Sequence, residues 1–171
     1  MSDKRIRSVG GQTVMCQDNE PLGSSGWFRR VAVIATGSLG NIENSLRHAA
    51  HLVPLAPTAF RRILPQVVDE DLFEALLDAG DCDTAARHLF GPHTALSVET
   101  FADDGAFRAI VGCAFLKQLV EGVGDTRATA MLDAWTKWLV TLRLEFGSDL
   151  EADPAAGLGA PSSVKSVCRV S

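Results

Sequence analysis

Two histidines with the spacing of metal ligands are among the residues of this chain best suited to chemistry. His48 and His51 lie three positions apart, so on a helix both imidazoles share one face, as paired zinc ligands do. Two other histidines, His88 and His93, flank the segment LFGP and follow an acidic and cysteine-containing stretch at 81–83, but no known metal-binding spacing supports a site there. We therefore interpret the pair as an exposed polar face and predict no metal and no cofactor.

A turn rich in glycine, TGSLGN at 36–41, precedes these histidines. Backbone amides at the start of a helix can hold an anion, although neither GxGxxG nor GxxxxGK[ST] occurs here. Trp135 is an aromatic side chain that could line a pocket between helices. The candidate small-ligand residues are Thr36, Gly37, Ser38, Gly40, Asn41, His48, His51 and Trp135.

The last ten residues, SSVKSVCRVS at 162–171, form a second candidate site. A spacer rich in Gly, Ala and Pro joins them to the rest of the chain. Short apolar and basic segments on a spacer of this kind bind partners by strand addition or by docking in a groove. The candidate docking residues are Val164, Lys165, Val167, Arg169 and Val170.

Composition excludes several classes of function. The chain has 171 residues, a formal net charge of −5 and 46% hydrophobic residues, which suffice for one packed domain. The acidic balance is unlike that of general nucleic-acid-binding proteins, and no apolar run is long enough for a membrane span. Four scattered cysteines and the absence of a signal peptide predict a cytoplasmic protein, and the preference for Arg over Lys suggests a bacterial source.

Helical periodicity dominates the middle of the chain. A stripe of apolar residues predicts a helix from a cap at Asp125 to Gly147, and similar patterns predict helices at 104–124, 69–79 and 83–90. Residues 27–53 keep spacings of three and four through both glycines of the turn. This pattern favours one long helix, kinked near 37–40, over the alternative of a strand at 29–36.

Residues 31–49 also resemble the opening strand, turn and helix of glutamine amidotransferases of the imidazole-glycerol-phosphate type. That resemblance would make Cys113 a nucleophile. The sequence IVGCAFL lacks the family's Gly-x-Cys-x-Gly turn, and all four histidines precede Cys113, whereas the family's histidine follows its cysteine. We therefore assign no family from the sequence.

The sequence as a whole predicts an all-α helical bundle of five or six helices at 26–147. A flexible arm at 1–25 and a disordered tail rich in Gly, Ala, Pro and Ser at 148–171 would flank it. The function predicted is a non-catalytic protein-interaction or regulatory module that binds a protein partner or self-associates as a homo-oligomer. The alternative is a small-ligand sensor or small enzyme with an anion site near 36–41.

Overall fold

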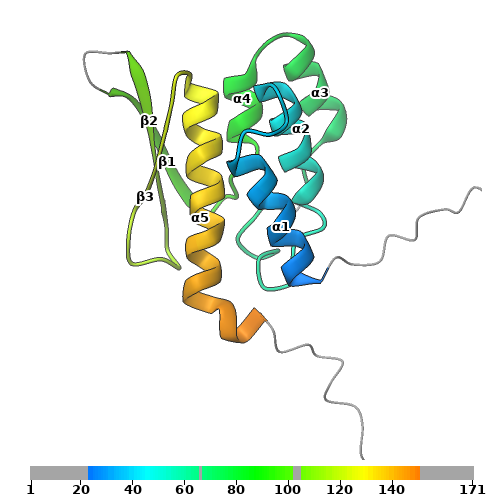
Figure 1. Cartoon of the computed structure of the whole chain (residues 1–171), viewed down its shortest axis with the longest axis vertical. Coiled ribbons are helices and arrows are strands. Elements are labelled where there is room, and N and C mark those ends of the chain that lie inside the picture. The colour runs from blue at the N-terminus through cyan, green and yellow to red at the C-terminus, as the bar shows by residue number, and fades with distance from the viewer. Residues whose placement is uncertain (1–22, 66, 102–104, 151–171) are drawn as a thin grey trace, which may run out of the picture.

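A computed structural model of the chain describes residues 23–65, 67–101 and 105–150. In this part of the chain one long helix, α5, separates a small sheet from a group of shorter helices (Figure 1). The helices are α1 (Ser24–Ala35), α2 (Ile42–Leu52), α3 (Glu70–Asp78), α4 (Cys82–Arg87) and α5 (Arg127–Leu150). The strands β1 (Thr94–Phe101), β2 (Ala106–Cys113) and β3 (Val120–Gly124) form an antiparallel meander in the order β1-β2-β3.

The prediction of an all-α helical bundle is wrong, because the structure contains a β-sheet. Residues 104–124, which were expected to form a helix, contain β2 and β3 instead. The apolar residues of this stretch fit two periods, because Phe107 and Val111 lie on one face of a helix and also on one face of a strand. Pairing with β1 in register, from Thr94 opposite Cys113 to Phe101 opposite Ala106, decides for the strand. Gly105, with a φ of 77°, supplies backbone geometry for the reversal before β2.

The expected single helix at 27–53 is also wrong, because the chain forms α1 and α2 with a turn between them. Gly37 and Gly40 have φ values of 67° and 85°, which no continuous right-handed helix contains. The alternative strand at 29–36 is equally excluded, since those residues belong to α1 and its C-terminal cap. The helical period was correct on either side of the turn, and the glycines interrupt it.

Polar side chains fix where the helices begin. Asn41, Asp69 and Asp81 each accept a hydrogen bond from the backbone N–H three residues later, at 2.8–3.1 Å. α5 begins with a reciprocal pair in which Thr126 and Thr129 each accept the other's backbone N–H, at 3.1 and 2.9 Å. The cap of α5 is thus Thr126, one residue after the expected Asp125.

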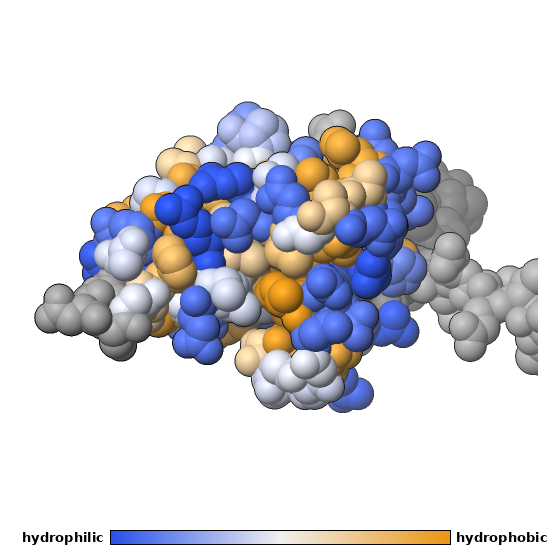
Figure 2. Space-filling model, turned by 90° about the horizontal axis from the view of Figure 1, so that it is seen from above, coloured by the Kyte–Doolittle hydropathy of each residue, from blue (hydrophilic) through white to orange (hydrophobic). Residues whose placement is uncertain are grey.

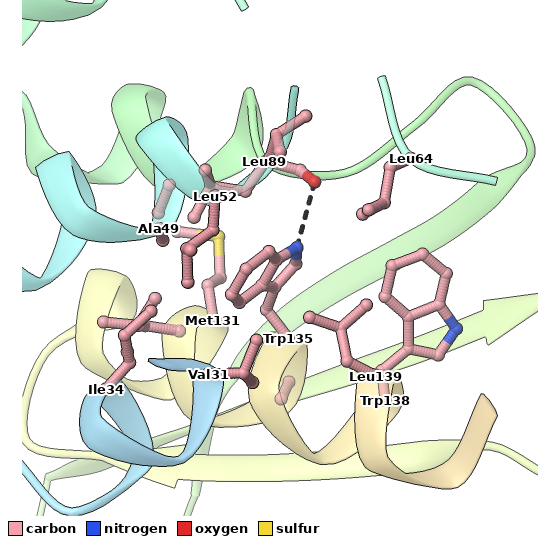
Figure 3. Close-up of a cluster of buried hydrophobic side chains, with 14 of the residues drawn as sticks. Val31, Ile34, Ala49, Leu52, Leu64, Leu89, Met131, Trp135, Trp138 and Leu139 are labelled. Atoms are coloured by element: carbon pink, nitrogen blue, oxygen red, sulfur yellow. Dashed lines mark hydrogen bonds between the residues drawn. The ribbon is translucent and has the colours of Figure 1, made fainter. Parts of the chain in front are cut away.

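The hydrophobic core fills the space between α5 and the shorter helices. Val31 and Ile34 of α1, Ala49 and Leu52 of α2, and Met131 of α5 surround the Trp135 ring (Figure 3). Towards the start of α1 a second cluster joins the rings of Trp27, Phe28 and Phe60, whose centroids are 5.0–5.8 Å apart.

On its other side α5 lies directly on the backbone of β3. A Cβ atom added at Gly122 would collide with the backbone of Ala130 and Ala134, and one added at Gly124 would lie 2.6 Å from the Ala130 nitrogen. Only glycine in the strand and alanine in the helix permit this approach. α5 is therefore buried on two opposite sides, by the shorter helices and by the sheet.

No helix in the described part of the chain combines the length and the apolar character needed to cross a membrane.

Gly122→Ala tests whether this contact holds the two layers together. The added methyl group must displace helix backbone, so we expect the free energy of unfolding to fall by about 1–3 kcal/mol or more. Gly147→Ala is the matched control, because its Cβ would meet nothing within 4 Å and alanine favours a helix. Urea denaturation followed by circular dichroism measures both; equal stability of the two variants would contradict the close contact.

Candidate functional site

The turn at 36–41 uses most of its polar groups to end one helix and begin the next. The Thr36 hydroxyl donates to the Val33 carbonyl at 2.8 Å and also pairs with the Ser38 hydroxyl. Asn41 caps α2, and its carbonyl accepts the Ser45 hydroxyl at 2.9 Å. These interactions explain why these residue types occur here without any ligand.

A small cleft of about 390 Å³ nevertheless opens beside this turn. Gly37, Gly40 and Asn41 line it on one side, and Asp133 of α5 lies among the residues opposite. The lining residues, all within the described chain, include no Lys, Arg or His. The cleft is large enough for a small molecule, but a carboxylate without a lining cation does not favour an anion.

The other candidate ligand residues do not converge on this cleft. His48 is half-buried and His51 is exposed on α2, while Trp135 is fully buried and donates its indole N–H to the Leu89 carbonyl at 3.1 Å (Figure 3). Among the described residues, no group of three or more His, Cys, Asp or Glu side chains could hold a metal ion. His88 and His93 are exposed near the end of α4 and before β1, and no three of the four histidines, all of which the structure describes, form a group that could hold a metal ion.

A larger surface cleft, of about 1140 Å³, runs over the face of α5 that lies between α1 and β3, and we call it the furrow. Ala35, Asp133 and Thr136 line both the furrow and the small cleft, so the two are continuous. The furrow is lined by Ser24, Phe28, Val31, Ala32 and Ala35 of α1; by Gln118, Leu119, Val120 and Glu121 at β3; and by Asp133, Thr136, Lys137, Val140, Thr141, Arg143, Leu144 and Gly147 of α5.

Large apolar side chains on the furrow's surface face solvent. Leu119 is 68% exposed, Val140 48% and Leu144 81%. Figure 2 shows a different face, the end of the molecule at which α5 begins, and there apolar side chains are interspersed with hydrophilic ones. Exposed Leu and Val side chains that share one cleft are typical of a surface for binding another molecule.

The charged groups of the furrow already have partners. Lys137 Nζ lies 2.6 Å from Asp133 Oδ2, and the Arg143 guanidinium lies 4.6 Å from the centre of the Phe28 ring. Glu121 Oε2 lies 3.8 Å from an Arg108 nitrogen on the outer face of the sheet. Paired charges around an apolar floor suit binding by shape and burial better than acid–base chemistry.

One wall of the furrow is the free edge of β3. Asp133 Oδ2 accepts the Val123 N–H at 2.9 Å, so the backbone groups of Val123 face away from β2. By the alternation of an antiparallel ladder those of Glu121 face away from β2 as well, and those of Gly122 face it. The N–H and C=O of Glu121 and the C=O of Val123 therefore point to the side on which a further strand would pair.

The sequence contained a signal for the furrow that its helical pattern concealed. Val140 and Leu144 lie four residues apart on α5, outside the stripe formed by Trp135, Trp138, Leu139 and Leu142. A second apolar stripe on one helix indicates a second contact surface. The candidate docking residues Val164, Lys165, Val167, Arg169 and Val170 lie outside the described residues.

Comparison with known proteins gives no relative: no family model, curated protein or solved structure matches this chain. The partial resemblance to glutamine amidotransferases also fails on the fold, because residues 31–35, its opening strand, are helical here. Cys113, its nucleophile, is half-buried at the end of β2.

Comparing phenylalanine variants of Trp135 and Trp138 measures how much the indole hydrogen bond of Trp135 adds to stability beyond the packing of the ring. Trp135→Phe leaves the buried Leu89 carbonyl without its donor, whereas Trp138 Nε1 is buried with no hydrogen-bond partner among the described residues. We expect Trp135→Phe to cost about 1–3 kcal/mol more of the free energy of unfolding than Trp138→Phe. Chemical denaturation of both variants decides this, and equal losses would contradict it.

His48 gives the fold a dependence on pH. Burial lowers the pKa of His48, and the nearby Arg30 and His51 lower it further. The unfolded chain then binds a proton near pH 6.5 that the folded chain takes up only at lower pH, so stability declines as the pH falls below about 6.5. We expect His48→Gln to lose less stability than the wild type between pH 7.5 and 5.5, and His88→Gln, at an exposed position, to behave as the wild type.

Proposed function

We propose that this chain is a non-catalytic protein-interaction module that binds an extended polypeptide segment in the furrow. The observation that carries the proposal is the placement of three exposed apolar side chains, Leu119, Val140 and Leu144, beside the free edge of β3. A segment lying there gains backbone hydrogen bonds from the strand and apolar burial from α5. This combination is the physical basis of recognition by strand addition.

The segment that fits has a definite pattern. Side chains alternate along a strand, so every second residue would face Val140 and Leu144, and the residues between them would face the outer side of the sheet beside Glu121 and Val123. The inner positions therefore favour small or branched apolar residues. The outer positions favour one apolar residue opposite Val123 and one cation opposite Glu121, and these two residues of the segment would lie two positions apart, as Val123 and Glu121 do.

A displayed library of random dodecapeptides, panned against the full chain, tests this function. We expect enrichment of peptides with branched apolar residues at alternate positions. Leu144→Asp should weaken the binding of synthetic copies at least tenfold, because it places a charge where apolar surface is buried. Calorimetry or fluorescence anisotropy measures the dissociation constants.

Val67→Asp is the matched control. Val67 is 81% exposed, as Leu144 is, but lies outside the furrow, so this variant should bind the peptides as the wild type does. Failure to enrich any peptide, or equal binding by the Leu144→Asp protein, would overturn the proposal. Enrichment that depends on the turn at 37–41 but not on Leu144 would favour the small cleft instead.

A further inference from the structure

We propose that the furrow's occupant in the free protein is a segment of the same chain, residues 164–170, added as a fourth strand along β3. This inference rests on the proposed function, and it names the occupant of that same site. The sequence predicted that these residues dock to a partner, whereas here they would bind the furrow of their own chain. They would cover the chain's own binding edge until a partner segment displaces them.

The geometry of α5 places this segment within reach. The helix lines the furrow from Asp133 to Gly147 and ends three residues later at Leu150, close to one end of the furrow. The distance from Asp133 to Gly147 along the helix is about 21 Å at 1.5 Å per residue. Residues 151–163 can span up to about 43 Å when extended, which is about twice this length.

The side-chain pattern of the segment matches both faces of the site. In a strand, Val164, Ser166, Cys168 and Val170 lie on the face turned towards α5, so a valine stands at each end of it, and the valine opposite Val120 lies nearest to Val140. Such a strand buries apolar surface that α5 otherwise exposes to water, and this burial favours docking.

The opposite face carries Lys165, Val167 and Arg169. With Val167 opposite Val123, one of the two cations stands opposite Glu121 whether the strand runs parallel or antiparallel to β3. Cross-strand pairs of opposite charge and of branched apolar residues both stabilise a sheet. The segment therefore complements the outer face of β3 in either direction.

Two other occupants from the same protein fit less well. Residues 6–9, IRSV, offer a cation and a valine two positions apart, but Gly10 and Gly11 follow at once and glycine is unfavourable in strands. The same 164–170 segment from a second copy has identical chemistry. A short linker, however, gives the attached segment an effective concentration in the millimolar range, above that of protein in dilute solution.

Disulfide trapping in the full chain tests the inference directly. Val140→Cys is introduced with Cys16, Cys82, Cys113 and Cys168 replaced by serine, and a second cysteine replaces Val164 in one protein and Val170 in another. A parallel strand in this register places residue 164 opposite Val120, and an antiparallel strand places residue 170 there. With oxidised glutathione at low micromolar protein, we expect one of the two proteins to form a disulfide between position 140 and its tail cysteine within one chain, found by peptide mass mapping of a species of monomer mass. Val67→Cys in the same background should link at least tenfold more slowly.

A second measurement does not depend on cysteine. Val164→Asp combined with Val167→Asp should remove the occupant, so that peptides enriched on the furrow bind this full-length variant at least tenfold more tightly than the wild type. A replacement of Ile6 and Val9 by aspartate is the control and should leave the affinity unchanged.

The outcomes separate the two proposals. Linked dimers, linking at position 140 that is no faster than at position 67, or equal peptide affinity in wild type and tail variant would each overturn the intramolecular strand while leaving the furrow's function intact. An increase in affinity with the Ile6 and Val9 variant alone would assign the furrow to the other segment. Absence of peptide binding to every variant would overturn the proposed function itself.

Discussion

The close approach of α5 to the backbone of β3 is the constraint on which the rest of the structure depends. Gly122 presents bare backbone to Ala130 and Ala134, and Gly124 presents it to Thr129 and Ala130, so the helix lies on the strand with no strand side chain between them. A helix held this close to a sheet covers one face of it and leaves its own opposite side for other partners. The shorter helices, α1 to α4, supply those partners, and their apolar side chains meet Trp135 and Met131 there. Two layers are thus organised by one helix.

The same constraint produces the furrow. Because the sheet has three strands and α5 lies against its edge strand β3, no further strand in the described part of the chain covers that edge. α1 packs on α5 a short distance away, and the surface between α1 and β3 is left to Val140, Leu144 and Leu119. Asp133 binds one backbone N–H of the edge and one lysine, which partly protects the strand against unspecific pairing. A binding edge that is shielded in part and apolar along its floor suits a selective partner segment.

Residues whose types suggested a ligand site in the sequence have structural roles in the fold. Asn41 and Thr36 complete helix ends, and Trp135 joins α5 to the end of α4 through the Leu89 carbonyl. His48 lies half-buried with its Nε2 atom unpartnered among the described residues, which makes it a source of acid sensitivity. Polar residues at helix ends and single aromatic residues at helical spacing have structural uses so frequent that sequence alone cannot distinguish them from a site.

The sequence by itself determined those elements whose signals are local. Asp69 and Asp81 cap α3 and α4, positive-φ glycines or prolines mark breaks, and the long apolar stripe of α5 runs close to its predicted bounds. Residues 106–124 were decided only by tertiary structure, because Phe107 and Val111 satisfy a helix and a strand equally and pairing with β1 supplies hydrogen bonds that local pattern does not reveal. The furrow also depends on the tertiary structure alone. Val140 and Leu144 on α5 become a surface beside Leu119 only when α5 is held between β3 and α1, and that contact joins segments far apart in the chain.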